Sequence, residues 1–511
     1  MIRFLLAVLL LSSTLRAAPF VIEVVDEQTN RGVPLVELRS SSNVRYFTDS
    51  AGIAAIDEPG WINQKVFFFI TSFGYEFPAD GFGEHGTAVE VKPGGAVKLK
   101  IKRLNIAERL YRITGEGIYR DTFLAGRKAP IEQPLLNAQT TGSDSVESAI
   151  YKGKIHFFWG DTGKLSYALG NFQTTGAVAD LPGSGGLDPS IGINLRYFTD
   201  ATGFAKHMVP LKEPGAVWVD EPLVLDDDQG RERMITAFSR VKDLGTCLER
   251  GLLVYNDDKD IFERLKPIPL NAPLAPNGHA FKVTIDNQPY FYFPRPYPCV
   301  RVKADWKSVT DLVDYEGFTP LKQGSRFSEE KTQLDRDNAG HVRFTWKKGT
   351  PPLEPLQIDK LLKSGKLSKD EVPTLLVDVD TKKPILLHGG SVYWNDYRKK
   401  YIMIGLQSMG ASMLGEIYFA ESEKPEGPWT RGKKIVTHHH EVPGTFGQQA
   451  ENMDFYNPTQ HPYYDQQGGR IIYFEGTYTH SFSGNAERTP RYEYNQMMYR
   501  LDLGDPRLNL H

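Results

Sequence analysis

Five short aromatic segments, each preceded by a polar turn, recur along the last 400 or so residues of this 511-residue chain. A strand-like run stands before each turn, so each segment is predicted to be the second strand of a β-hairpin. The intervals between the hairpins are unequal, which is typical of repeats whose loops differ in length. The five segments are Ile155 to Trp159, Arg233 to Phe238, Pro289 to Phe293, Tyr401 to Gly405 and Ile471 to Phe474.

Radial repetition is one way in which an all-β chain of this size limits its exposed sheet edges. The hairpins therefore predict a five-bladed β-propeller over residues 110–505. The last blade has three clear strands, and we expect residues 117–123 to supply the fourth and join the two ends of the ring. A charged insertion at about 311–385 interrupts blades three and four, with helical segments at 356–363 and 368–372. This insertion is interpreted either as a lid or as a solvated loop.

Residues 20–103 show a different pattern, in which short alternating strands are separated by glycine-containing turns. This pattern predicts a β-sandwich in front of the propeller, so the fold class is all-β throughout. The turns Thr48-Asp49-Ser50-Ala51-Gly52 and Gly74-Tyr75 resemble those of the transthyretin-like, or carboxypeptidase regulatory-like, domain. The resemblance implies a structural or spacer role, with carbohydrate binding or partner docking as alternatives. The expected strands are 21–25, 33–39, 52–56, 66–72 and 96–102.

The chain begins with a charge at Arg3, an apolar run from Phe4 to Leu11, and small residues at Ala17 and Ala18. The apolar run is too short to cross a bilayer, which needs about 20 residues. The pattern is typical of a cleaved signal peptide over residues 1–17, with an uncleaved anchor as the alternative. We therefore expect a secreted or periplasmic protein that has no stable membrane span after cleavage.

The overall charge is close to balanced, with 60 Lys and Arg against 63 Asp and Glu. A nucleic-acid partner is not expected, because duplex-binding proteins carry a basic surface. Only two cysteines are present, so there is no disulfide framework and no cysteine zinc site, and whether Cys247 pairs with Cys299 stays open. Nucleotide-binding, zinc-protease and dinucleotide-binding motifs are absent from the sequence. No cofactor is expected, with a structural cation in the propeller channel left open.

Polar residues flank the predicted hairpins at one end. The first strand of a hairpin runs one way and the second returns, so the start of the first and the end of the second share one mouth of the ring. Asp144 precedes the first hairpin and Asp161 follows it. Glycosidic bond cleavage needs two carboxyl groups, so we predict that these two are the catalytic pair. The alternative is that each aspartate caps a turn.

Other residues are expected at the same mouth. Glu221 is interpreted either as the acid or as an ion-paired residue at the edge of the core, and Glu475 is the replacement if Asp161 does not act. The expected substrate-binding residues are Arg240, His279, Arg295, Gln407, Asn457, His461 and Tyr478.

Two stretches resemble known enzymes. Gly142-Ser143-Asp144, followed after one hairpin by Trp159-Gly160-Asp161-Thr162, resembles the first blade of a five-bladed glycoside hydrolase group that includes bacterial endo-D-arabinanases. Gly415 to Ser422, with Gly427-Pro428-Trp429, is similar to blade strands of the arabinanase and β-xylosidase clan. The resemblance implies that the matching aspartates form the catalytic pair. The chain departs from that clan's three-carboxylate pattern at His279, where a glutamate would stand.

Three functions follow from these observations. The first is an exported glycoside hydrolase that cleaves a polysaccharide or oligosaccharide with the carboxylate pair. The second is a polysaccharide lyase, in which His279, His461 or Tyr478 is the base and Arg240 or Arg295 neutralises a uronate. The third is a non-catalytic propeller that binds a glycan or a protein. The glycan, internal or chain-end cleavage, and stereochemical outcome stay open.

Overall fold

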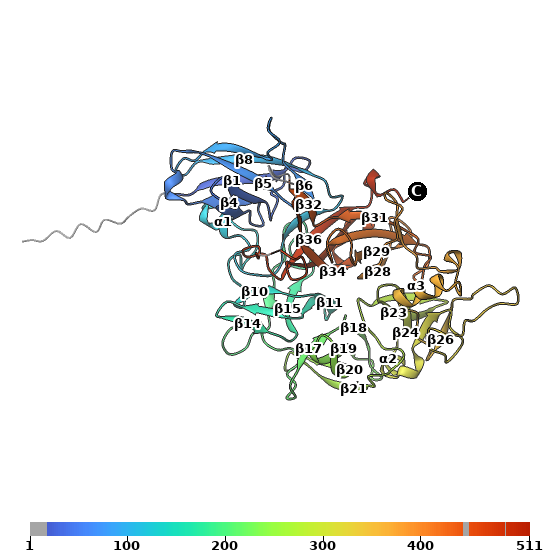
Figure 1. The fold of residues 1–511 in the computed structure, drawn as a ribbon. Helices are drawn as coiled ribbons and strands as arrows, with labels where there is room; N and C mark the ends of the chain where they lie inside the picture. Colours follow the sequence, from blue (N-terminus) through green and yellow to red (C-terminus); the bar gives the residue numbers. More distant parts are fainter. Residues whose placement is uncertain (1–17, 443–448, 486, 511) are drawn as a thin grey trace, which may run out of the picture.

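The computed structural model describes residues 18–442, 449–485 and 487–510 (Figure 1). Strands dominate and the helices are short, so the all-β expectation is confirmed. The proposed leader, residues 1–17, lies outside the described residues. Among the residues described, no helix combines the length and apolar character that a membrane span requires.

The N-terminal part contains two four-stranded sheets, with strand orders β4-β1-β8-β6 and β3-β2-β5-β7. Strands β1 and β8 are parallel, and the other pairs are antiparallel. The two sheets share one hydrophobic core, to which Ile22, Leu38, Phe68 and Ile101 contribute. The bounds are β1 Phe20–Asp26, β2 Glu37–Ser40, β3 Arg45–Phe47, β4 Ile53–Ile56, β5 Lys65–Thr71, β6 Tyr75–Glu76, β7 Gly86–Glu90 and β8 Ala96–Arg103.

Five sheets of four or five strands follow and are arranged around a ring (Figure 1). We number these ring sheets one to five in chain order. Sheet one holds β11 Val146–Tyr151, β12 Lys154–Trp159, β15 Thr175–Asp180 and β16 Arg196–Tyr197. Sheet two holds β17 Ala216–Val219, β18 Leu223–Asp226, β19 Glu232–Asp243, β20 Thr246–Asn256 and β21 Ile261–Ile268.

The other three ring sheets are built in the same way. Sheet three holds β22 Phe281–Ile285, β23 Gln288–Pro294, β24 Pro298–Lys303, β25 Glu316–Thr319 and β26 Thr345–Lys348. Sheet four holds β27 Val377–Asp378, β28 Leu387–Asn395, β29 Lys400–Gln407, β30 Glu416–Ser422 and β31 Arg431–Val436. Sheet five holds β34 Asp454–Gln460, β35 Ile471–Thr479, β36 Asn495–Asp502 and β9 Glu108–Arg112.

Each aromatic segment predicted to be a second strand pairs antiparallel with the strand before it. The pairs are β11–β12, β18–β19, β22–β23, β28–β29 and β34–β35, so the five predicted hairpins are confirmed. The second strands of these hairpins contain almost continuous runs of buried residues, because side chains on both faces pack against neighbouring sheets. Trp159, Phe293 and Phe474 are buried in this way.

The prediction for the ring-closing strand was wrong. Residues 117–123 do not pair with the last sheet, because α1 (Arg120–Leu124) begins there. Strand β9, at Glu108–Arg112, pairs with β36 instead. All five residues of β9 are buried, because β9 lies between the ring and the N-terminal part, where Arg109 donates to the Phe73 carbonyl and the Arg112 amide donates to Ser50 Oγ.

The segment at 311–385 both extends sheet three and adds helices. Strands β25 and β26 lie within it, as does α3 (Pro355–Lys363), so the helical prediction at 356–363 is confirmed. The remaining short elements are α2 Trp306–Thr310, the 3-10 helices at 59–61, 312–314, 369–371, 462–464, 467–469 and 506–508, the sheet of β10 Thr140–Ser143, β13 Thr162–Lys164 and β14 Tyr167–Asn171, and the hairpin of β32 His439–Val442 and β33 Gln449–Asn452.

Candidate active site

Asp144 and Asp161 lie side by side at the open end of the β11–β12 hairpin. The Asp144 amide donates a hydrogen bond to the Asp161 carbonyl at 2.8 Å, and the Gly160 amide donates to the Asp144 carbonyl at 2.8 Å. The first strand begins and the second strand ends at this point. We call the side of the ring on which first strands begin and second strands end the mouth face.

The Asp144 carboxylate is half-buried and held by two hydroxyl groups. Its Oδ1 accepts hydrogen bonds from the Tyr456 hydroxyl at 2.5 Å and from Ser145 Oγ at 2.8 Å. Burial raises the pKa of Asp144 to about 6; the charge of Asp161 acts in the same direction, and the two hydroxyl donors oppose it. This carboxyl group therefore holds a proton at mildly acidic pH.

Asp161 has a different partner. Trp218, from β17 of sheet two, donates its indole N–H to Asp161 Oδ1 at 2.9 Å. Burial raises the pKa of Asp161, and the indole hydrogen bond lowers it. Burial also raises the pKa of Tyr494, and the charges of both aspartates raise it further, so this phenol lies near the pair. Two carboxyl groups in unlike surroundings are the arrangement that divides acid and base roles.

Replacing Trp218 with Phe removes the only indole donor to Asp161 among the described contacts while keeping an aromatic ring. Hydrogen bonds to charged groups contribute about 1.5–3 kcal/mol. We therefore expect the activity of the variant to fall by about 10- to 100-fold, measured as kcat/KM, with folding unchanged by circular dichroism. Wild-type kcat/KM in the variant would show that this hydrogen bond does not serve the reaction.

A second acidic cluster joins sheets one, two and three. The Nδ1 atom of His279 lies 3.0 Å from Glu147 Oε2 and 3.2 Å from Glu221 Oε2, and Thr459 Oγ1 lies 2.8 Å from its Nε2. Burial alone would lower the pKa of His279, but the two glutamates raise it to about 10. Burial also raises the pKa of Glu147. His279 is therefore an imidazolium that neutralises buried carboxylates.

The same cluster has the donor set of a cation site. One ligand atom each from Glu147, Glu221 and His279 lies within 4.8 Å of the others. Two carboxylates and an imidazole suit a divalent metal ion. An ion bound there would replace the proton on His279 Nδ1, so these residues fit the structural cation left open by the sequence. Sequence reasoning missed Glu147, although a charged residue inside a first strand was a usable signal.

His461 and Glu475 form a buried hydrogen-bonded pair. His461 Nε2 lies 2.6 Å from Glu475 Oε1, both side chains are 0% exposed, and the Tyr463 hydroxyl lies 2.8 Å from His461 Nδ1. Tyr478 is also buried, in a hydrophobic cluster of the ring. The structure therefore places Glu475, His461 and Tyr478 in the interior, where none contacts solvent.

The other predicted binding residues are divided between two environments. Arg240 lies on β19, where it bonds to Glu249 at 2.9 Å across the β19–β20 hairpin. Arg295 is exposed after β23 and lowers the pKa of Asp220, which burial raises. Arg240 is thus neutralised, whereas Arg295 faces the mouth.

Asn457 adjoins the aspartate pair. It adopts a left-handed backbone conformation with φ of 50°, which asparagine tolerates, and its side-chain amide donates to Ser145 Oγ. Gln407 ends β29 on the mouth face opposite Glu416 of β30. Sequence reasoning missed Tyr456, on β34, and Tyr494, immediately before β36, both of which are far from Asp144 in the sequence. The cysteines Cys247 and Cys299 are both free thiols.

No protein-family model matches the sequence, and no curated protein matches it. Solved structures of glycoside hydrolases are similar to this chain in fold, with low TM-scores and low sequence identities. An exo-β-1,3-galactanase from Phanerochaete chrysosporium has TM-score 0.37 and 9% identity, over 78% of this chain and 65% of that one. An exo-1,5-α-L-arabinanase from a bovine ruminal metagenomic library has TM-score 0.33 and 11% identity, over 71% and 94%. These values say nothing about the reaction of this chain.

Proposed function

We propose that the chain is an exported glycoside hydrolase that cleaves a polysaccharide or oligosaccharide at the mouth face of a five-bladed β-propeller. In this proposal residues 20–103 are a transthyretin-like β-sandwich and residues 110–505 are the propeller. Export rests on the signal-like pattern of residues 1–17. The proposal depends above all on one observation, the adjacency of Asp144 and Asp161 at the open end of one hairpin, each with its own hydrogen-bond donor.

The different surroundings of the two carboxyl groups support a division of roles. Asp144, with a pKa of about 6, holds the proton that the departing glycosidic oxygen needs. Asp161, fixed by the Trp218 indole, is the carboxylate that attacks the anomeric carbon or takes a proton from the attacking water. In either route the proton leaves Asp144 as the carbon–oxygen bond breaks. Asn457 and Tyr494, beside the pair, are placed to contact the sugar.

A lyase is less well supported. A lyase base must be unprotonated and must reach the substrate. His279 is held as an imidazolium between two glutamates, and His461 and Tyr478 are buried. Arg240 is already paired with Glu249. Of the residues that this alternative requires, Arg295 alone is exposed.

The experiment is an assay of the purified chain on arabinan, galactan and xylan. We expect new reducing ends without an increase in ultraviolet absorbance. Ultraviolet-absorbing, unsaturated products would indicate a lyase. Binding of a glycan without any new reducing ends would indicate a non-catalytic propeller.

The pH dependence tests the role of Asp144. The protonated form is present below a pKa of about 6, so we expect kcat/KM to fall as the pH rises through that value. Replacing Tyr456 with Phe removes a donor to the ionised carboxylate, which raises the pKa and shifts the fall to higher pH. Tyr478→Phe is the matched control, because its hydroxyl contacts Thr489 and not the pair. An unchanged profile in Tyr456→Phe would remove Asp144 from the role of acid.

A further inference from the structure

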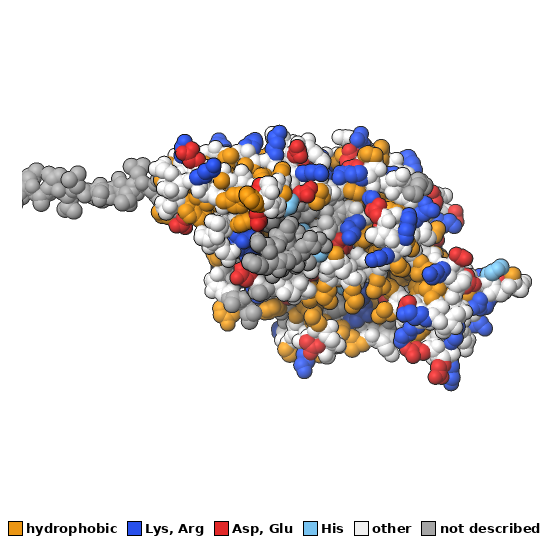
Figure 2. Space-filling model, turned by 45° about the horizontal axis from the view of Figure 1, so that its top comes forward, with side chains coloured by type: hydrophobic (Ala, Val, Ile, Leu, Met, Phe, Trp, Pro, Cys, Tyr) orange, Lys and Arg blue, Asp and Glu red, His pale blue; other side chains and the backbone are white. Residues whose placement is uncertain are grey.

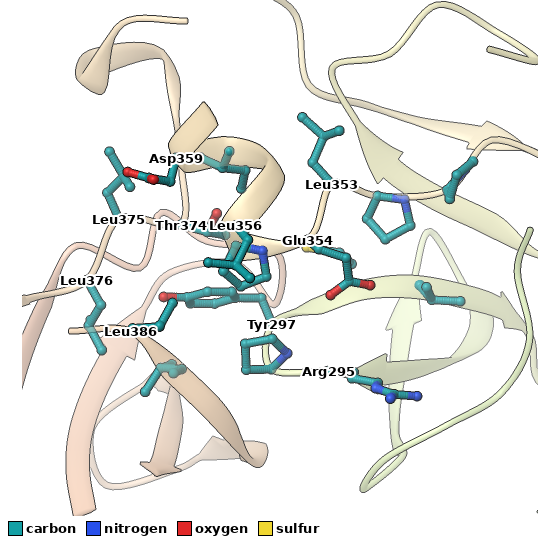
Figure 3. Close-up of a pocket in the computed structure, with 18 of the residues that line it drawn as sticks. Arg295, Tyr297, Leu353, Glu354, Leu356, Asp359, Thr374, Leu375, Leu376 and Leu386 are labelled. Atoms are coloured by element: carbon teal, nitrogen blue, oxygen red, sulfur yellow. The ribbon is translucent and has the colours of Figure 1, made fainter. Parts of the chain in front are cut away.

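A cavity of about 710 Å³ lies between ring sheets three and four, against α3 (Figure 3). Its volume is that of a ligand pocket, which ranges over about 300–1,000 Å³. The insertion and the segment leading into β28 supply much of its wall. Neither the aspartate pair nor the Glu147 cluster lines it.

The wall of this cavity is mainly aliphatic. Leu353, Leu356, Leu376 and Leu386 surround the space in Figure 3, and Arg295 lies at its lower edge. Arg295, Glu354 and Asp359 supply polar groups to part of the wall. The aliphatic part offers no hydrogen-bond partner to a sugar hydroxyl, and burying such a group there costs free energy. A hydrocarbon chain would instead gain from leaving water. The wall therefore selects an aliphatic ligand over a saccharide.

The cavity lies on the mouth face. Asn277 and Arg295 line it, and they stand before the first strand and after the second strand of sheet three, as Asp144 and Asp161 do in sheet one. The residue after Asn277, Gly278, donates its amide to Asp220 Oδ1 at 3.0 Å. The cavity wall is therefore continuous with the acidic mouth of the ring.

Exposed apolar side chains occur on the same face. The connections between second and third strands carry them in sheets one, two, four and five: Leu165, Tyr167, Leu244, Met409 and Phe482. Figure 2 shows hydrophobic side chains gathered across the lower middle of the molecule, in a view that displays one side. None of these side chains lines the cavity, so the preference for an aliphatic ligand depends on the cavity wall itself.

We propose that the cavity binds the aliphatic chain of an acylated or lipid-linked glycan, whose saccharide part reaches Asp144 and Asp161. The assignment of the saccharide as substrate rests on the proposed function. Binding of the aliphatic chain does not rest on it, because neither Asp144 nor Asp161 lines the cavity. Arg295, between the cavity and the mouth, lies where the chain joins its polar head.

The test is calorimetric titration of the full chain with hexyl, heptyl and octyl β-D-glucosides below their micelle concentrations. We expect Kd to fall about fourfold for each added CH₂ group and glucose not to bind. An affinity independent of chain length would overturn the proposal. Phenyl β-D-glucoside is a further arm, and binding as tight as that of the octyl compound would assign an aromatic ligand instead.

Variants locate the binding. Leu356 is 67% exposed and Leu386 is 37% exposed, so aspartate at either position is compatible with folding. We expect Leu356→Asp and Leu386→Asp each to weaken octyl glucoside binding at least tenfold. Val313→Asp, at another residue that is 67% exposed but lies outside the cavity, is the control and keeps wild-type affinity. Equal affinity for octyl glucoside in all three variants would show that the alkyl chain binds outside this cavity and would overturn the proposal.

The two proposals fail separately. Asp144→Asn is expected to keep alkyl glucoside binding and lose hydrolysis. If the wild type shows alkyl-chain-length dependence but no hydrolysis, the cavity still binds the aliphatic chain and the hydrolase proposal is wrong. If the wild type hydrolyses a glycan but shows no alkyl-chain-length dependence, the hydrolase proposal holds and the aliphatic-chain proposal is wrong. If both hold, the KM for an octanoylated oligosaccharide is lower than for its deacylated form, and equal KM values would show that the chain site does not serve the substrate.

Discussion

Asp144→Asn and Asp161→Asn are each expected to lower the hydrolysis rate by about 10²–10⁴-fold, because positioned acid–base groups contribute this much. Asparagine keeps the size of the side chain and can still accept the bonds from Tyr456 and Trp218, so folding should persist. The measurement is reducing-end release at the pH of maximal activity. Circular dichroism and thermal melting establish that the variants are folded.

The control for this pair is Asp286→Asn. Asp286 is exposed in the β22–β23 turn, at the end of the hairpin opposite the mouth, and its backbone φ of 48° suits asparagine. We expect wild-type activity in this variant. Turnover within a few-fold of wild type in Asp144→Asn and Asp161→Asn would show that neither residue takes part in the reaction. Asp220, whose pKa is raised by burial against the opposing charge of Arg295, would then be the carboxyl group to replace.

His279→Ala should destabilise the fold by about 3–5 kcal/mol, because it leaves Glu147 and Glu221 buried without their cation. The folded pKa of His279 is about 10, above its ordinary value near 6.5. Its contribution is therefore complete below about pH 6.5 and is lost as the pH rises towards 10. Urea denaturation at pH 6 and pH 9 measures both the loss and its pH dependence.

Two further variants make this result specific. Combining His279→Gln with Glu147→Gln and Glu221→Gln removes all three charges and should recover much of the lost stability, because no uncompensated charge remains. His341→Ala, at a side chain that is 76% exposed, should change the stability by less than about 0.5 kcal/mol. A similar free energy of unfolding for His279→Ala and His341→Ala would contradict the imidazolium assignment.

Local features of the chain could be predicted from its sequence. The ring hairpins follow from aromatic strands that come after polar turns, and Asp144 and Asp161 are close because a single hairpin joins them. The helix at 356–363 follows from its pattern and from Pro355 at its start. In each case the determining residues are near one another in sequence.

Long-range contacts were beyond sequence reasoning. Tyr456 reaches Asp144 from the opposite end of the chain, and Thr459 joins His279 across the ring. No spacing rule relates residues whose proximity depends on closure of the whole ring. Arg240 was predicted to bind substrate because its partner Glu249, across the β19–β20 hairpin, could not be identified before the register was known.

Pairing of β9 with β36 has a consequence for biosynthesis. The fifth sheet needs β9, which precedes the other ring strands in the sequence, and β36, which is the last strand of the described residues. During translation β9 therefore waits without its neighbour until β36 has been synthesised. The ring therefore closes last, and folding of the fifth sheet follows that of the sheets encoded before it.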